Sequence, residues 1–140
     1  MLEVKGRGLV EGECEGRLLI SSMPLSFYGG VDPETGVVVD REHDLYDRCL
    51  KGVILVFPYS KGSTVGSYTI LRLARRGLAP AGIVNLVSEP IVVIGCILGG
   101  IPLMDKPSVN IVELRDSLNG VKARMVVEGR DGVLEVLERV

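Results

Sequence analysis

The sequence predicts an α/β domain in which the two ends of the chain form a β-barrel-like framework around a parallel strand–helix–strand unit. Residues 2–20 alternate imperfectly between apolar and polar, and glycines mark bends of the kind that suit a tightly curved barrel. Residues 53–57 and 82–87 are apolar runs typical of buried strands, and a helix-like pattern separates them. Residues 121–138 alternate around a turn at 129–132, which predicts a hairpin.

The long segment 21–40 is predicted to be an ordered loop. Pro24, Gly29–Gly30 and Asp32–Pro33 favour turns, and Val37–Val39 has the composition of a short strand. A loop of this length in a compact domain is usually functional. His43, the only histidine, stands among charged residues, which is typical of a surface position.

The central segment carries the strongest candidate for a site. Pro58 ends the first buried strand, a turn of small residues spans 60–64, and Gly77 ends the helix that follows. In that helix, residues recur at about three-residue spacing: Val65, Tyr68, Leu71 and Ala74. A hydroxyl-rich turn before a helix can hold an anion or a reacting hydroxyl, and it can equally be an ordinary helix cap.

The second half of the chain is predicted to continue the α/β pattern and then return to β structure. The strand at 82–87 implies a parallel crossover from the first buried strand. A helix is expected over 90–98, with Ser88 as its cap and Gly99–Gly100 as its end. A short strand follows at 101–104, and residues 110–140 are expected to be β structure.

The composition predicts one cytoplasmic domain spanning residues 1–140. No apolar run approaches the roughly 20 residues that cross a bilayer, and the N-terminus is charged where a signal peptide is apolar. A net charge of −2 and the absence of tryptophan argue against a nucleic-acid platform. An apolar content of 46% in 140 residues leaves apolar surface that a partner subunit could cover.

The central turn lacks the elements of a complete catalytic site. It is not a Walker A loop, since Lys61 precedes Gly62, and the one histidine does not make a triad. Lowering the pKa of a serine costs about 1.4 kcal/mol per unit, whereas a helix N-terminus supplies at most about 2 kcal/mol. The chain alone is therefore not expected to be an enzyme.

The cysteines do not predict a metal site in this chain. Cys14, Cys49 and Cys96 lie far apart, and none belongs to a Cys-x-x-Cys pair. We therefore expect free thiols in a reducing compartment and no metal ligands.

Four stretches together resemble a known family. They are PLSFYGGVDPETGVVVDREHD at 24–44, KGSTVGSYTI at 61–70, SEPIVVIG at 88–95 and GIPL at 100–103. They are similar to the small subunits of aconitase X-type dehydratases, and the resemblance extends from the first strands to about Met104. The first stretch is the most specific of the four.

The resemblance implies a swivelling β/β/α domain, the mobile small domain of the aconitase superfamily. It implies a heterodimer whose large subunit, and not this chain, holds a [4Fe-4S] cluster. The implied reaction is loss of water from (R)-5-phosphomevalonate, giving trans-anhydromevalonate 5-phosphate, in an archaeal mevalonate pathway. A related activity on cis-3-hydroxy-L-proline, or a non-catalytic anion-binding swivel module, is the alternative.

The resemblance also implies roles for individual residues. Ser63 matches the serine that accepts the substrate proton. The residues implied in substrate binding are Lys61, Gly62, Thr64, Gly66, Ser67, Ser26, Gly29, Gly30 and Asp32. Two positions depart from the family pattern: Lys61 stands where arginine is usual, which loses a bidentate contact, and Val65 replaces a serine.

Overall fold

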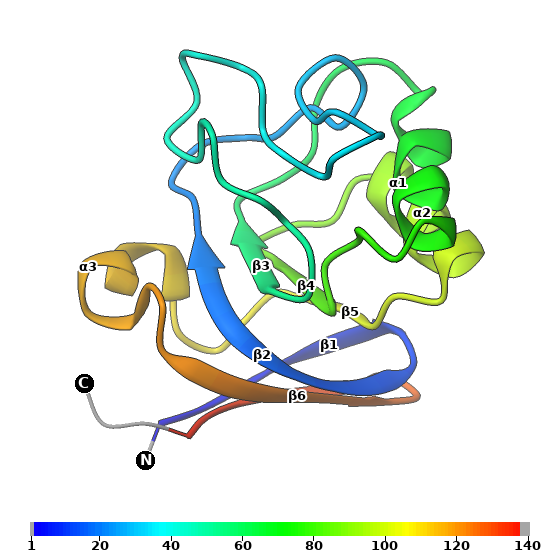
Figure 1. Ribbon diagram of the computed structural model, residues 1–140. Coiled ribbons are helices and arrows are strands. Elements are labelled where there is room, and N and C mark those ends of the chain that lie inside the picture. Colours follow the sequence, from blue (N-terminus) through cyan, green and yellow to red (C-terminus); the bar gives the residue numbers. More distant parts are fainter. Residues whose placement is uncertain (1, 138–140) are drawn as a thin grey trace.

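Within residues 2–137, which the computed structural model describes, seven strands close into a barrel in the order β1-β5-β4-β3-β2-β6-β7 (Figure 1). The predicted α/β fold with a barrel framework is therefore confirmed. The strands are β1 (Glu3–Val10), β2 (Gly12–Ile20), β3 (Ile54–Phe57), β4 (Gly82–Asn85), β5 (Leu103–Asp105), β6 (Lys122–Glu128) and β7 (Asp131–Val136).

The ends of the chain and its middle belong to the same barrel. β2, β3, β4 and β5 pair in parallel, whereas β6 and β7 form the predicted antiparallel hairpin and pair with β2 and β1. Residue 138, the last of the predicted hairpin, lies outside the described residues. The side chains of β3 are buried on both sheet faces: Ile54 and Val56 lie in the barrel interior, and Leu55 and Phe57 face the helices and the long loop. A strand that is covered on both faces needs apolar residues at every position, which explains the continuous apolar sequence of β3.

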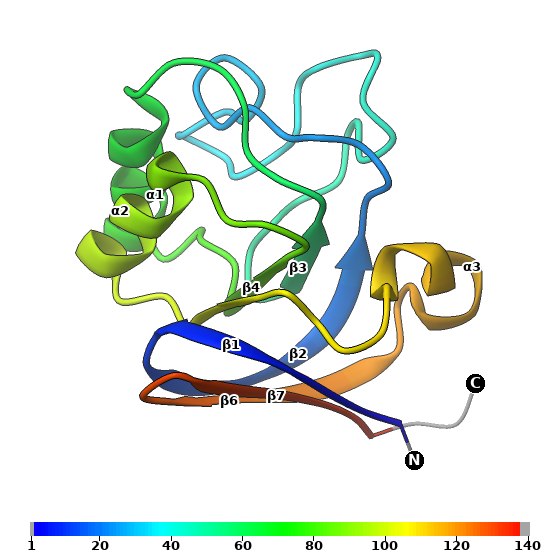
Figure 2. The same cartoon turned by 180° about the vertical axis from the view of Figure 1, so that it is seen from behind.

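Helices α1 (Gly66–Arg75) and α2 (Pro90–Gly99) lie side by side on one flank of the barrel (Figures 1 and 2). The helices approach closely at Gly95, which has no side chain. A Cβ at this position would lie 2.6 Å from the Ile70 Cδ1 atom. The predicted ends are confirmed, since Gly77 and Gly100 both have positive φ and follow the helices. The buried face of α1, however, is formed by Gly66, Ser67, Thr69, Ile70 and Leu73, and not by the residues at the expected spacing.

The expectation that Ser88 caps α2 is wrong. The helix begins after Glu89, whose side chain makes no capping hydrogen bond. The Ser88 hydroxyl instead donates to Asn85 Oδ1 at 2.9 Å, and its N–H donates to the buried Asp105 carboxylate at 2.9 Å. Ser88 therefore ties the start of the α2 connection to strands β4 and β5.

Two expectations of strand structure are also wrong. Residues 110–120 contain a 3-10 helix, η1 (Ile111–Leu114), and a short helix, α3 (Arg115–Leu118), on the flank of the barrel opposite α1 and α2 (Figure 2). Ile111 and Leu118 from this segment complete the core inside the barrel. Val37 and Val38 form only isolated bridges, to Cys49 and Val31 of the same loop, and not a strand.

Residues 21–50 fold into a long loop that lies over the end of the barrel from which β2 and β3 emerge (Figure 1). The expectation of a surface histidine is wrong, since His43 is only 5% exposed. Its Nδ1 atom accepts the Leu45 N–H at 3.0 Å, so Nε2 carries the proton and donates to the Pro24 carbonyl at 3.0 Å. His43 therefore fixes the first turn of the loop against its later part.

Asp44 anchors the same loop and predicts an acid-sensitive stability. Burial acts to raise the pKa of Asp44, but hydrogen bonds from Ser21 and Ser22 and the charge of Arg115 together lower it. A lowered folded-state pKa stabilises the fold above the unfolded value of about 4, and this contribution is lost as pH falls through the folded pKa. Asp44→Asn is therefore expected to lower the free energy of unfolding at pH 7 and to lower it by less at pH 3.

Urea unfolding of the wild type and of Asp44→Asn at both pH values measures this difference. Asp47→Asn is the matched control, because Asp47 is exposed on the same loop. An equal difference between wild type and Asp44→Asn at pH 7 and pH 3 would contradict the assignment.

Candidate functional site

The candidate site is the turn that joins β3 to α1. Beyond Pro58, the chain pairs with the start of the long loop: the Leu25 N–H donates to the Tyr59 carbonyl at 3.2 Å, and the Lys61 N–H donates to the Leu25 carbonyl at 3.1 Å. These bonds form a parallel bridge between Leu25 and Ser60. Segments more than 30 residues apart in the sequence are thus held side by side.

Small residues let the loop and the turn touch. Gly62 has φ +90°, and a Cβ there would lie 2.4 Å from the Ser26 Oγ atom. A Cβ at Gly30 would lie 2.2 Å from the Ser26 carbonyl oxygen, and one at Gly66 would lie 3.6 Å from the Tyr28 nitrogen. The structure therefore brings Ser26, Gly30, Gly62 and Gly66 together.

Ser63 is exposed at the outer end of this turn. Its Oγ atom accepts the Val65 N–H at 3.2 Å, and its carbonyl accepts the Gly66 N–H at 2.9 Å. Ser63 thus supports the turn that leads into α1, although regular helix begins three residues later. Among residues 2–137, no acceptor takes the Ser63 hydroxyl proton, so the hydroxyl has a helix-start donor on one side and solvent on the other.

The other candidate residues are placed differently. Lys61, Thr64 and Gly29 are exposed near the turn. Ser67 is buried, and its hydroxyl donates to the Ile91 carbonyl at 2.7 Å, so it joins α1 to the first turn of α2. Asp32 Oδ1 accepts the Glu34 N–H at 2.8 Å within the loop. Ser67 lies in the first turn of α1, where its N–H donates to the Thr64 carbonyl at 3.2 Å, and Asp32 belongs to the long loop.

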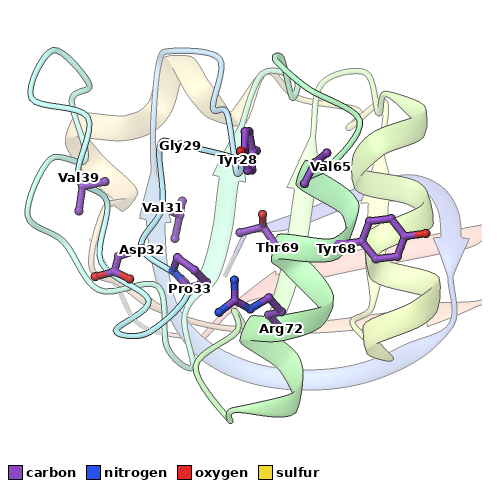
Figure 3. Close-up of a pocket in the computed structure, with 10 residues that line it drawn as sticks. All are labelled: Tyr28, Gly29, Val31, Asp32, Pro33, Val39, Val65, Tyr68, Thr69 and Arg72. Atoms are coloured by element: carbon purple, nitrogen blue, oxygen red, sulfur yellow. The ribbon is translucent and has the colours of Figure 1, made fainter.

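A pocket of about 360 Å³ separates the long loop from α1 (Figure 3). Its wall is mostly apolar, and Arg72, which is paired with Glu34 at 3.0 Å, projects into it from α1. Neither Ser63 nor Lys61 is among its lining residues, which are Tyr28, Gly29, Val31, Asp32, Pro33, Val39, Val65, Tyr68, Thr69 and Arg72.

Sequence reasoning did not single out Tyr28, Val39, Thr69 or Arg72 as pocket residues. A usable signal was present for one side of the pocket, because Val65, Tyr68 and Arg72 follow one another at helical spacing. The other side comes from the loop, whose path over α1 depends on contacts far along the chain.

The residues of this chain do not fit an iron–sulfur cluster. Cluster ligands are thiolates, but burial raises the pKa of Cys14 to about 11 and that of Cys96 to about 12. Cys49 is exposed on the long loop. Across the described part of the chain, no three histidine, cysteine, aspartate or glutamate side chains gather as metal ligands would.

No described helix has the length and apolar character to cross a membrane.

Known proteins resemble this chain over nearly its whole length. The small subunit of phosphomevalonate dehydratase from Methanocaldococcus jannaschii is 49% identical over 99% of this chain and 100% of its own. The corresponding subunit from Pyrococcus furiosus is 45% identical over 97% and 96%. The crystal structure of aconitase X from Thermococcus kodakaraensis, in its holo form, superposes with a TM-score of 0.88 at 42% identity, covering 99% of this chain and 100% of that one.

The family model of the aconitase X swivel domain matches residues 3–136. This match spans every strand of the barrel, the long loop and the turn that carries Ser63. The resemblance inferred from the four sequence stretches is thereby confirmed. The chain belongs to the aconitase X swivel-domain family.

Proposed function

We propose that this chain is the small subunit of a heterodimeric, cytoplasmic hydro-lyase that converts (R)-5-phosphomevalonate to trans-anhydromevalonate 5-phosphate. The names of its relatives support the substrate and the subunit role. The observation that carries the proposal is the Ser63 turn, which presents an exposed hydroxyl to solvent with no acceptor for its proton among residues 2–137. Such a half-site requires a second chain, to which we also assign the [4Fe-4S] cluster.

In this proposal Ser63, in its deprotonated form, accepts the proton from the substrate carbon next to the carboxylate. The C–H electron pair forms the new double bond, and the hydroxyl on the neighbouring carbon leaves as hydroxide, which takes up a proton to become water. The Val65 N–H already points at the Ser63 oxygen, and a hydrogen bond of this kind favours the deprotonated form. A helix start contributes at most about 2 kcal/mol, however, so the remaining stabilisation has to come from a closed, water-free interface with the large subunit. Lys61 adds a positive charge near the turn.

We assign the remaining candidates either to direct contact with the substrate or to holding the loop and turn in place around it. Lys61 and Thr64 are exposed next to Ser63 and would contact the substrate directly, Lys61 through its charge. Gly29, Gly30, Gly62 and Gly66 keep the loop and turn free of side chains, which allows backbone N–H groups to approach an anion. Ser26 would hold the loop in place through its hydroxyl, which donates to the Tyr28 carbonyl at 2.9 Å. Ser67 and Asp32 would do so through the hydrogen bonds described above.

Reconstitution with a large subunit tests the proposal. The complex is expected to dehydrate (R)-5-phosphomevalonate, and this chain alone is expected to be inactive. Turnover of cis-3-hydroxy-L-proline and not of phosphomevalonate would overturn the substrate assignment. Binding of phosphomevalonate without turnover by a complex that contains the cluster would instead favour an anion-binding swivel module.

A further inference from the structure

We propose that the large subunit docks on one apolar face of this chain, formed by Tyr28, Val65, Tyr68, Ile94, Ile97 and Leu98. We call this the docking face. It spans the long loop, α1 and α2 on the flank of the barrel where the two helices lie (Figure 1). The identity of the partner rests on the proposed function, whereas the location of the face rests on the features that follow.

Helix α2 is apolar on every side although one side is exposed. Its ten residues, Pro90–Gly99, include no charged or polar side chain. Val92, Gly95 and Cys96 are buried against the rest of the protein, whereas Ile94, Ile97 and Leu98 are 50%, 60% and 49% exposed. These three follow an i, i+3, i+4 pattern and form one stripe. A helix that is apolar all round is normally buried all round, so this stripe calls for a cover.

Helix α1 continues the stripe with a ridge between two hollows. Tyr68 is 64% exposed and Val65 is 44% exposed. On one side of them lies the pocket shared with Tyr28, and on the other lies a groove of about 250 Å³ shared with Ile94 and Leu98. Figure 3 shows the Tyr68 ring extending past α1, away from the pocket and toward α2. A ridge with apolar hollows on both sides can interlock with a complementary surface.

Charged groups lie at two ends of the docking face. At one end Arg72, which projects into the pocket, and Arg76 both pair with Glu34, at 3.0 and 2.9 Å. Lys61 is exposed beyond the other end, next to the turn. An apolar centre with a polar rim is the composition of a protein–protein interface.

The position of the Ser63 turn selects the large subunit as the occupant. Thr64 and Val65 line the groove between α1 and α2, so the docking face, which includes Val65, begins two residues after Ser63. A large subunit seated here would bring its own half of the site to the exposed hydroxyl. A second copy of this chain seated here would cover the turn and exclude that half.

Charge substitutions on the two helices test the face. Ile97→Glu and Tyr68→Glu replace highly exposed side chains, and circular dichroism would verify that each variant remains folded. In calorimetric titration with the isolated large subunit, each is expected to raise Kd at least tenfold. Val109→Glu is the matched control: Val109 is an exposed apolar residue on the loop that bonds to β1 through Ser108 and Lys5, and its Kd is expected to stay within about twofold of the wild type.

Two further measurements separate this inference from the proposed function. With saturating large subunit, Ile97→Glu is expected to recover wild-type turnover of phosphomevalonate; if the complex turns over another substrate, the rise in Kd still supports the face. Unchanged Kd values for both variants would overturn the proposal. So would a wild-type homodimer that Ile97→Glu dissociates while the affinity for the large subunit stays the same.

Discussion

Replacing Ser63 by alanine is expected to lower kcat of the reconstituted complex by about 10²–10⁴-fold, the usual contribution of a positioned proton acceptor. The substitution removes the only side-chain group that the turn presents between the Val65 N–H and solvent. With substrate deuterated at the carbon that loses the proton, the kinetic isotope effect is expected to rise, because proton transfer then limits the rate. Affinity for the large subunit is expected to stay unchanged, since the hydroxyl lies outside the docking face.

The control has to separate catalysis from the support that Ser63 gives to the turn before α1. Loss of the Ser63–Val65 hydrogen bond costs about 0.5–1.5 kcal/mol of stability, which leaves a folded protein well below its Tm. Ser117→Ala removes an exposed hydroxyl from α3, on the opposite flank, and is expected to leave kcat unchanged. A kcat for Ser63→Ala within about threefold of the wild type would show that Ser63 only supports the turn, since proton acceptors contribute far more than this.

The fold was predictable wherever neighbouring residues decide the structure. The buried strand at Ile54–Phe57 and the hairpin from Lys122 to Val136 follow from their apolar patterns. Gly77 and Gly100 end their helices because glycine adopts positive φ at little cost. In each case the signal lies within a few residues of the feature.

Predictions failed where a distant partner decides the structure. Ser88 has the residue type of a helix cap, but the Asp105 carboxylate, which Arg7 also contacts, takes its N–H. His43 stands among charges in the sequence, yet the Pro24 carbonyl holds its ring in the interior. Residues 110–120 turn into short helices because Ile111 and Leu118 complete a core whose other members come from every strand of the barrel.

The candidate site shows the same division. The turn at 60–64 and the loop glycines were recognisable from sequence, and the structure brings Gly62 and Gly30 to Ser26. The exposure of Val65 and Tyr68 was not recognisable, since their spacing suits a buried face as well as an uncovered one. Only the packing of α1 against α2 through Ile70 and Gly95 decides which side of the helix faces outward.

Of the substitutions considered, Phe27→Ala is expected to lower the free energy of unfolding most. It is also expected to disturb the candidate site. Phe27 is fully buried although it belongs to the long loop, and its ring meets that of Phe57 edge to face, with centroids 6.0 Å apart. Removing a buried phenylalanine costs about 3–5 kcal/mol. Phe27 lies between Ser26 and Tyr28, and a Cβ at Gly66 would be 3.7 Å from its Cβ, so the loop is expected to loosen from the Ser63 turn.

Urea unfolding of this chain measures the stability, and turnover of the complex below the Tm of the variant measures the effect on the site. Tyr28→Ala removes the neighbouring aromatic ring, which is exposed, and is expected to change stability by about 0.5 kcal/mol or less. A double-mutant cycle of Phe27→Leu and Phe57→Leu is expected to give a coupling of about 0.5–1.5 kcal/mol for the ring pair. If Phe27→Ala were as stable as Tyr28→Ala, the loop would be held by its hydrogen bonds to residues 59–61 and not by the core, and the link between barrel packing and the position of Ser63 would be lost.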